Sequence, residues 1–496
     1  MTHKNRENGV LLPIFCLPGN YGIGTLGKSA YDFVDFLSEC HVNIWQILPL
    51  NVTSYGDSPY QSPSGNGLNY YFIDLDTLVD KNLLTKEDIN EFDFGKDERR
   101  VDYSLLFNNR IKVLKKAFKN FDKSNEEFIL FEKEGTYKDF AFFMTMKELN
   151  SFSPWYKWKD KYSIELEKKI LEENHDLYLF YIWTQFEFLN EYFSLKKYAN
   201  EHSIKLMGDM PLYLSLDSLE AYKYDKLFKF DEKHNPIIVA GCPPDYFNED
   251  GQLWGNPIYD WDYMKKTGYE WWNKRIESNL KLFDILRIDH FRGIAAYYTI
   301  PYGSKNAKNG EWVKGPGMDL FKGKEDLPII AEDLGMIDDH VRKLLKESGY
   351  PGMKVLEFAF DGSRDNEHKP SQAKYNYVCY TGTHDNDTLV GYISSLDDKQ
   401  LEIFKQDLKH ECELFGVEYH SYSSRELAKS VIRLCYGSPC RLSIVPLSDL
   451  IGFGSEARLN MPSILNGNNW TFRFVKDDFT TGLTAFLKDT LKEYNR

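Results

Sequence analysis

Short apolar runs, each bounded by turn-forming residues, recur along the whole chain of 496 residues. Runs of this kind are typical of buried parallel β-strands, because helices cover both faces of a parallel sheet and leave few polar positions. The sequence contains eight of them, at residues 9–18, 43–50, 204–214, 283–290, 326–333, 353–360, 375–385 and 440–449.

Amphipathic helical patterns lie between several of these runs, at residues 29–40, 176–202, 338–349 and 424–435. Eight strands that alternate with helices predict an α/β fold, a (β/α)8 TIM barrel. A doubly wound open sheet is the alternative for the same pattern. After the last strand only a loop, residues 452–463, and a helix near 479–494 follow, so no C-terminal β-sandwich domain is expected.

Two connections are too long for simple crossovers, since most such connections are short. Residues 51–175, charged and rich in tyrosine, are expected to form an inserted helical subdomain after the second strand. Residues 215–265, rich in Pro, Gly and aromatics, are expected to form an irregular inserted loop subdomain over the active site, after the third strand. We therefore expect a single catalytic barrel over 1–496 with two insertions.

Charge and cysteine content narrow the class of protein. The 61 Lys and Arg against 75 Asp and Glu give a net charge of −14 without a basic cluster, which disfavours nucleic-acid binding. Seven cysteines without a CxxC pair indicate reduced thiols, with neither a disulfide framework nor a zinc site. The start of the sequence, residues 1–19, lacks a signal-peptide core or a membrane span, so a cytoplasmic location is expected.

Acidic residues fall at or near the carboxyl ends of four predicted strands. Asp209, Asp289, Glu332 and Asp385 lie at or near the ends of the apolar runs of strands three, four, five and seven. In a barrel these strand ends form the catalytic face. An aspartate at such a position can instead cap the next helix, but four of them converging on one rim favour a catalytic site.

Arg287 and Asp289 lie two positions apart on one strand, so their side chains point the same way. A nearby guanidinium is expected to keep the Asp289 carboxylate ionised, which suits a nucleophile. Glu332 follows an apolar run and needs a raised pKa to donate a proton. Two carboxyl groups with separated pKa values are what a retaining glycosidase requires.

Six motifs occur in a specific order along the chain: SYGDSPYQSPS (54–64), GDMPLYL (208–214), GCPPDYFNEDGQLWGNPIYDW (241–261), RIDHFRG (287–293), AEDLG (331–335) and GTHDNDT (382–388). With these motifs the chain resembles, nearly end to end, the 4-α-glucanotransferases called amylomaltases or disproportionating enzymes, glycoside hydrolase family 77. The resemblance implies transfer of α-1,4-glucan segments between maltodextrins, with no metal or organic cofactor. The implied partners are maltodextrins derived from starch or glycogen and glucose or oligosaccharide acceptors, with no nucleic acid and no membrane.

The resemblance also implies roles for individual residues. Asp289 would be the nucleophile, Glu332 the general acid and base, and Asp385 a third carboxylate that binds and distorts the donor sugar. The residues implied to contact substrate are Arg287, His384 and Asp209 as hydrogen-bonding groups, Tyr60 as a stacking ring, and Gln252 and Trp254 on a loop over the cleft. Two other functions are compatible with the same barrel. One is an α-amylase-like hydrolase, and the other is a non-catalytic glucan-binding protein.

Two features depart from the family pattern. After SPYQSPS many relatives carry an Ala-Phe-Ala-Gly-Asn-Pro run, whereas this chain reads GNGLNYYF (65–72). Tyr392 also stands where a Trp is commoner. Neither change affects the three carboxylates, but the first can alter the loop beside the donor sugar.

The segment 241–260 is unusually apolar and stiff for a surface loop. It contains prolines and four aromatic rings, those of Tyr246, Phe247, Trp254 and Tyr259. We expect it to fold over the cleft and to limit the entry of water to the glycosyl enzyme.

Overall fold

Eight parallel strands form the central sheet of the computed structural model, which describes residues 6–54, 56–244, 249–462, 464 and 467–496. The strands of this sheet are β1 (Glu7–Leu11), β2 (Ile44–Gln46), β3 (Lys205–Met210), β6 (Ile285–Ile288), β9 (Ile329–Ala331), β10 (Gly352–Val355), β11 (Tyr377–Tyr380) and β12 (Leu442–Pro446). Each expected apolar run contributes one of them, so the eight predicted strands are confirmed.

The sheet closes into a barrel. Its strand order is β10-β11-β12-β1-β2-β3-β6-β9, with parallel pairing throughout. At the seam between β9 and β10 the Ala331 N–H donates to the Pro351 carbonyl at 2.9 Å. The (β/α)8 barrel is therefore confirmed, and the open doubly wound sheet is wrong.

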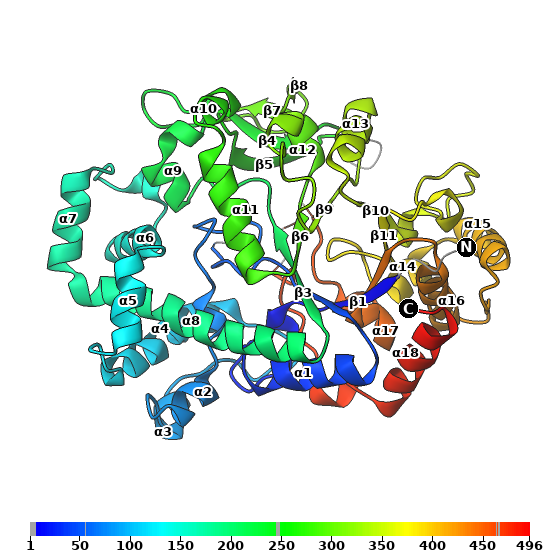
Figure 1. The fold of residues 1–496 in the computed structure, drawn as a ribbon, viewed down its shortest axis with the longest axis horizontal. Coiled ribbons are helices and arrows are strands. Elements are labelled where there is room, and N and C mark those ends of the chain that lie inside the picture. Colours follow the sequence, from blue (N-terminus) through cyan, green and yellow to red (C-terminus); the bar gives the residue numbers. More distant parts are fainter. Residues whose placement is uncertain (1–5, 55, 245–248, 463, 465–466) are drawn as a thin grey trace.

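Helices surround the barrel, as Figure 1 shows. The principal ones are α1 (Lys28–Glu39), α8 (His175–Glu201), α11 (Glu270–Leu282), α13 (Asp339–Ser348), α14 (Leu389–Ser395), α15 (Asp398–Phe415), α16 (Ser424–Gly437), α17 (Leu447–Ile451) and α18 (Thr481–Glu493). The helices expected from the pattern at 29–40, 176–202, 338–349 and 424–435 are α1, α8, α13 and α16. In α13 the ends follow local chemistry: Asp338 caps its first turn, and Gly349 ends it with a φ of 71°.

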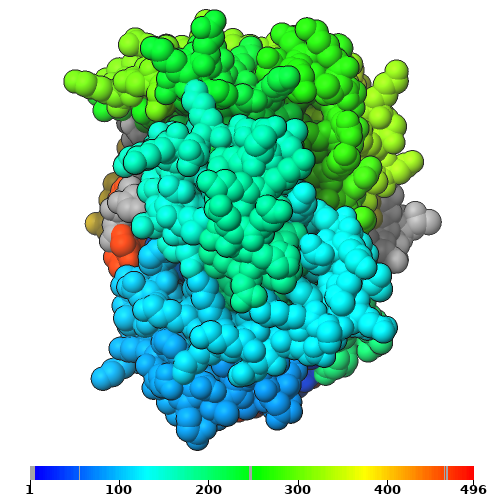
Figure 2. All heavy atoms as spheres, turned by 90° about the vertical axis from the view of Figure 1, so that its left-hand side faces the viewer, coloured from blue at the N-terminus to red at the C-terminus, as the bar shows by residue number. Residues whose placement is uncertain are grey.

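The chain between β2 and α8 begins as a loop and then forms a series of helices. It forms α2 (Leu75–Asp80), α3 (Lys86–Asn90), α4 (Tyr103–Asn120), α5 (Glu126–Glu134), α6 (Lys138–Leu149) and α7 (Ile164–Glu173). These helices, cyan and light blue in Figure 2, cover one face of the molecule; α4, α5, α6 and α7 pack on α8, and α3 packs on α4.

The connection after β3 is more regular than expected. It contains the short helices α9 (Leu219–Lys223) and α10 (Trp261–Lys266) and the strands β4 (Ile238–Cys242) and β5 (Gln252–Pro257). These strands join β7 (Ala296–Pro301) and β8 (Glu311–Lys314) in an antiparallel sheet of order β5-β4-β7-β8, seen at the top of Figure 1 beside α12 (Arg292–Ala295). The expected irregular insertion is therefore partly a sheet, because its pairing partner comes from beyond β6.

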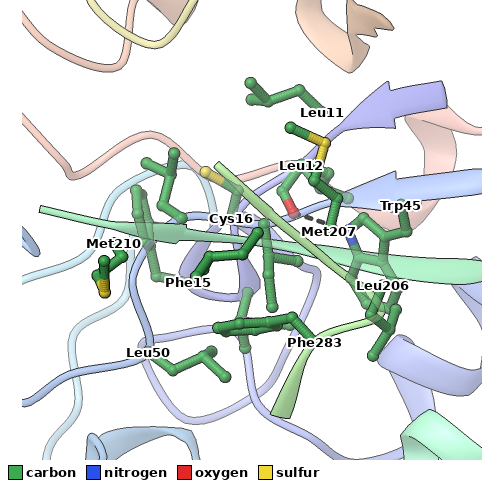
Figure 3. Packing of buried hydrophobic residues seen from close by; sticks show 14 of the residues in the cluster. Leu11, Leu12, Phe15, Cys16, Trp45, Leu50, Leu206, Met207, Met210 and Phe283 are labelled. Carbon is green, nitrogen blue, oxygen red and sulfur yellow. Dashed lines mark hydrogen bonds between the residues drawn. The ribbon is translucent and has the colours of Figure 1, made fainter. Parts of the chain in front are cut away.

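Buried side chains on both sides of the barrel wall form the main core, part of which Figure 3 shows. The Trp45 indole N–H donates to the Leu12 carbonyl at 2.8 Å, so even the polar atom of this buried ring is paired. Gly208 on β3 must lack a side chain, because a Cβ there would lie 2.1 Å from the Phe283 ring. Among the described residues, no helix combines the length and apolarity needed to cross a membrane.

Candidate active site

A cleft of about 280 Å³ lies at the carboxyl ends of the barrel strands. It brings together seven of the residues singled out from the sequence: Tyr60, Gln252, Trp254, Asp289, Glu332, His384 and Asp385. Asp289 follows β6 directly, Glu332 follows β9, and His384 with Asp385 lies in the turn after β11. The convergence arises because parallel strands of a barrel all end at the same face.

Asp209 and Arg287 lie directly behind this lining, almost fully buried. The Arg287 guanidinium donates from Nη1 to Asp209 Oδ2 at 2.5 Å and from Nη2 to Asp289 Oδ1 at 3.1 Å. The Tyr60 hydroxyl also donates to Asp209 Oδ2, at 2.8 Å. One buried arginine thus fixes both the candidate nucleophile and the carboxylate that holds Tyr60.

Tyr60 and His384 form one wall of the cleft. Their rings stack with centroids 4.9 Å apart and an interplanar angle of 19°. Burial lowers the pKa of His384, with Asp385 opposing, which favours a neutral imidazole. Its Nδ1 lies 3.3 Å from the Tyr60 hydroxyl and its Nε2 lies 3.5 Å from Asp385 Oδ1. The stacked pair is therefore a rigid, hydrogen-bonded unit beside the third carboxylate.

Two backbone N–H groups hold the Glu332 carboxyl in place. His290 N–H donates to Oε2 at 2.7 Å and Leu334 N–H donates to Oε1 at 2.6 Å. His290 reaches this position with a φ of 49°, a conformation that costs energy for a residue with a side chain. Burial raises the pKa of Glu332, although Arg287 and these N–H groups oppose the rise. A raised pKa suits a proton donor.

The Asp289 carboxyl differs from our expectation. Burial raises its pKa well above the ordinary value; Arg287 opposes this, whereas the charges of Asp209, Glu332 and Asp385 add to it. Arg287 favours the ionised Asp289 carboxylate, as expected, but burial and the charges of the three other carboxylates outweigh it, so the net direction of the pKa is upward. The two central carboxyl groups titrate as a pair, and a pH–rate profile will report the pair.

A network behind Asp385 fixes its turn and was not apparent from the sequence. Asn386 Oδ1 accepts from the Thr383 N–H and hydroxyl, both at 2.9 Å, and Asn386 Nδ2 donates to Glu357 Oε1 at 3.0 Å. From the other side Asn460 Nδ2 donates to Asp385 Oδ1 at 2.6 Å. Asn460 thus contacts the Asp385 carboxylate directly, whereas Asn386 and Glu357 hold the turn that carries it.

Glu357 predicts a pH-dependent stability that can be measured. Burial raises its pKa from 4.5 to about 8, so the unfolded chain releases this proton first and the free energy of unfolding falls as pH rises between those values. Glu357→Gln cannot ionise and keeps the oxygen that accepts from Asn386. We expect it to gain roughly 1–3 kcal/mol over wild type between about pH 5 and about pH 9.

Melting temperatures of both proteins at the two pH values test this expectation. The exposed Glu402→Gln on α15 is the control and should follow wild type at both. If the difference in melting temperature between Glu357→Gln and wild type is the same at both pH values, Glu357 ionises normally.

The strand β5 brings Trp254 and Gln252 to the lining of the cleft. The Trp254 indole N–H donates to Gln252 Oε1 at 3.0 Å, and its ring packs edge-on against His290 with centroids 4.8 Å apart. Tyr259, expected on the same lid, is instead fully buried, and its hydroxyl donates to the Leu212 carbonyl. Tyr246 and Phe247 lie outside the described residues.

Several residues that line the cleft were missed by sequence reasoning: Ser58, Gln61, Pro211, Tyr213, Asn256, His290, Asn460, Pro462 and Trp470. Ser58, Gln61, Pro211, Tyr213, Asn256 and His290 stand inside the quoted motifs, so proximity to a motif residue was the available signal. Asn460 and Trp470 come from the chain after β12, where no such signal exists. Within the described residues, no group of three or more His, Cys, Asp or Glu side chains is arranged to hold a metal ion.

Comparisons with known proteins agree with this geometry. The glycoside hydrolase family 77 model, described as 4-alpha-glucanotransferase, matches residues 12–477. The 4-alpha-glucanotransferase of Clostridium butyricum is 44% identical over 497 residues, covering 97% of this chain and 99% of that protein. That of Streptococcus pneumoniae is 42% identical over 506 residues, covering 99% and 98% respectively.

A solved structure matches the whole fold. The amylomaltase from Streptococcus agalactiae in complex with acarbose superposes with a TM-score of 0.93 at 38% identity, covering 99% of this chain and 100% of that one. The family model and these relatives span nearly the entire sequence. The chain therefore belongs to glycoside hydrolase family 77, the 4-α-glucanotransferases.

Proposed function

We propose that this chain transfers α-1,4-glucan segments between maltodextrins by a retaining double displacement centred on Asp289 and Glu332. One observation carries the assignment of roles: the two carboxyl groups follow the strands β6 and β9, which are neighbours in the barrel, and line one cleft. Arg287 contacts Asp289, while backbone N–H groups hold Glu332. The transferase activity itself is that of the family.

In the first half of the cycle Glu332 protonates the glycosidic oxygen while Asp289 attacks the anomeric carbon. The bond to the leaving sugar breaks and a covalent β-glycosyl enzyme forms. In the second half Glu332, now a base, removes the proton of an acceptor 4-hydroxyl, which attacks and restores the α configuration. Asp385, Tyr60 and His384 are proposed to hold the donor sugar.

Asp209 and Arg287 are proposed to act on the same donor sugar. Both are buried behind the lining, and Asp209 accepts from Tyr60. We further propose that residues 51–175 and 215–265 are the two insertions that wall the cleft of the single barrel. The natural substrates are proposed to be maltodextrins derived from starch or glycogen in the cytoplasm, with glucose or short oligosaccharides as acceptors.

Incubation with maltotriose and chromatography of the products tests the proposed function. A transferase produces glucose together with longer oligomers and leaves the total number of reducing ends unchanged. A hydrolase on the same barrel would raise the number of reducing ends, and a glucan-binding protein without catalysis would leave maltotriose intact. Either of the last two outcomes would contradict the proposal.

Trp254 offers a test of how transfer competes with hydrolysis. Water at about 55 M greatly exceeds any acceptor, so the enzyme must exclude water and orient the sugar, for which effective molarities are sufficient. Trp254 lines the cleft beside His290. We expect Trp254→Ala to raise the ratio of hydrolysis to transfer by roughly threefold or more, measured as new reducing ends per glucose released.

The control is Trp312→Ala on β8, a partly exposed ring of the same small sheet that lies outside the cleft lining. It should leave the ratio unchanged. If Trp254→Ala lowers both reactions by the same factor, Trp254 only supports the strand, and its role in excluding water is wrong.

A further inference from the structure

A second cleft, of about 530 Å³, lies outside the barrel, where helices α5, α8 and α11 meet the loop after β2. Its size is in the range of small-molecule sites. Its apolar lining comprises Leu50, Leu68, Leu130, Phe131, Tyr137, Phe186, Leu189, Phe193, Leu282 and Phe283. Figure 3 shows Leu50 and Phe283 among the packed side chains at the barrel wall, so the inner part of this cleft rests on the rigid core.

Apolar side chains of this cleft are unusually exposed. Phe193 on α8 is 44% exposed and Leu130 on α5 is 61% exposed. They adjoin Phe131 and Phe186, whose ring centroids lie 5.5 Å apart. Single exposed apolar residues are normal, but a group around a cleft marks an interaction site. The cleft is thus built to receive a ligand with an apolar surface.

Polar side chains also line this cleft. The lining includes the amides of Asn66 and Asn190, the hydroxyl of Ser278 and the carboxylates of Glu127 and Glu134. Together they offer hydrogen-bond donors and acceptors at one site, which is what a ligand with many hydroxyl groups requires. The charged lining residues are Glu127, Glu134 and Lys281, so the cleft has no excess of positive charge that would select an anionic ligand.

The loop that borders this cleft is held in place by side chains from other parts of the chain. The Gly65 N–H donates to Glu220 Oε1 at 2.9 Å and the Leu68 N–H donates to Gln185 Oε1 at 2.8 Å. Between them Asn66 is exposed and lines the cleft. Its small polar side chain places an amide at the edge of the cleft.

The same loop joins the two clefts. Tyr60 and Gln61 line the active-site cleft, and Gly65, Asn66 and Leu68 line the second one a few residues later. A polymeric substrate is large compared with either cleft, so one enzyme can hold it at two places.

We propose that this second cleft is an accessory site for an α-1,4-glucan chain. The apolar C–H faces of the glucose rings pack on Phe193 and Phe131, and the hydroxyl groups bond to the amides and carboxylates at the rim. The site retains long glucans near the active site and contributes nothing to short donors. The proposal rests on the transferase function of the family, and its test separates the two.

Binding is measured by the retardation of the protein in native gels that contain glycogen, in an Asp289→Asn background to prevent turnover. Phe193→Ala removes the exposed ring, and Asn66→Phe places a ring in the cleft. Each is expected to weaken the apparent affinity for glycogen by about fivefold, the range of one lost ring contact. The matched control is Phe107→Ala on α4, a ring of similar exposure, 48%, outside the cleft, which should bind like the parent.

Kinetic measurements on the same variants complete the test, made in the active enzyme that keeps Asp289. Phe193→Ala and Phe107→Ala should both disproportionate maltotriose at the parent rate, whereas Phe193→Ala alone should show a raised KM for long amylose. If Asn66→Phe loses activity with maltotriose, the substitution has displaced the loop that also carries Tyr60. The glycogen affinity of Phe193→Ala then decides whether the cleft binds glucan.

Equal retardation of Phe193→Ala and Phe107→Ala in glycogen gels would overturn the proposal while leaving the transferase function intact. Sedimentation velocity tests whether a second copy of this chain occupies the cleft instead. A dimer of the parent protein that Phe193→Ala dissociates, with glycogen binding unchanged, would make the cleft an interface between two copies and would also overturn it.

Discussion

Asp289→Asn is expected to lower the turnover of maltodextrin by about 1000-fold or more, equivalent to about 4 kcal/mol of transition-state stabilisation. An amide cannot form the glycosyl ester, so the first displacement fails. The change should not harm the fold. Burial raises the pKa of Asp289, so its ionised form costs stability above its ordinary pKa, and a neutral amide of the same shape removes that cost.

The expected combination is therefore an inactive protein whose melting temperature at about pH 7 equals or exceeds that of wild type. The exposed Asp262→Asn on α10 is the matched control and should keep full activity. Substantial transfer by freshly purified Asp289→Asn would contradict the role of nucleophile. A large fall in melting temperature would instead indicate that the contact with Arg287 is essential to the barrel.

The barrel could be predicted because its signal is local. Each strand is a continuous apolar run, and its position in the order of strands follows from alternation with helices. The ends of the strands were less predictable, since the run 204–214 stays apolar beyond β3. The strand stops at Met210 because Pro211 has no N–H for the sheet. The carboxylates at the strand ends were predictable for the same local reason.

Features that depend on distant pairing could not be predicted. The pattern at 238–242 does not reveal that it pairs with 296–301, so the small sheet was expected to be irregular. Asn460 reaches Asp385 from a segment 75 positions away, and nothing in its own motif indicates this contact. The raised pKa of Asp289 depends on burial among three other carboxylates, which only the folded chain defines.

The left-handed backbone conformation of His290 is another feature that could not be predicted from the sequence. A positive φ is uncommon for a residue with a side chain, and no glycine marks the position. It persists because it directs the His290 N–H to Glu332. Local sequence preference is overridden here by the requirement to hold a catalytic carboxyl, as is common at functional sites.

Glu332→Gln separates the two halves of the reaction. The variant cannot protonate a sugar leaving group, so turnover of maltotriose should fall by about 1000-fold. A donor such as α-maltosyl fluoride needs no such proton, because fluoride leaves readily. Asp289 should still attack it, and the absence of a base then slows the second displacement, so a covalent maltosyl enzyme accumulates.

Mass spectrometry of the intact protein, followed by peptide mapping, should place the added maltosyl group on Asp289. The neighbouring Asp333→Asn is the matched control: Asp333 accepts from the Met353 N–H at 2.6 Å and lies outside the cleft lining. Its rates with maltotriose and with the fluoride should change by the same factor, because a structural change does not distinguish leaving groups. If Glu332→Gln also loses both activities equally and no adduct forms on Asp289, then Glu332 is not the acid and base, and its two N–H contacts serve only to hold β9 against β6.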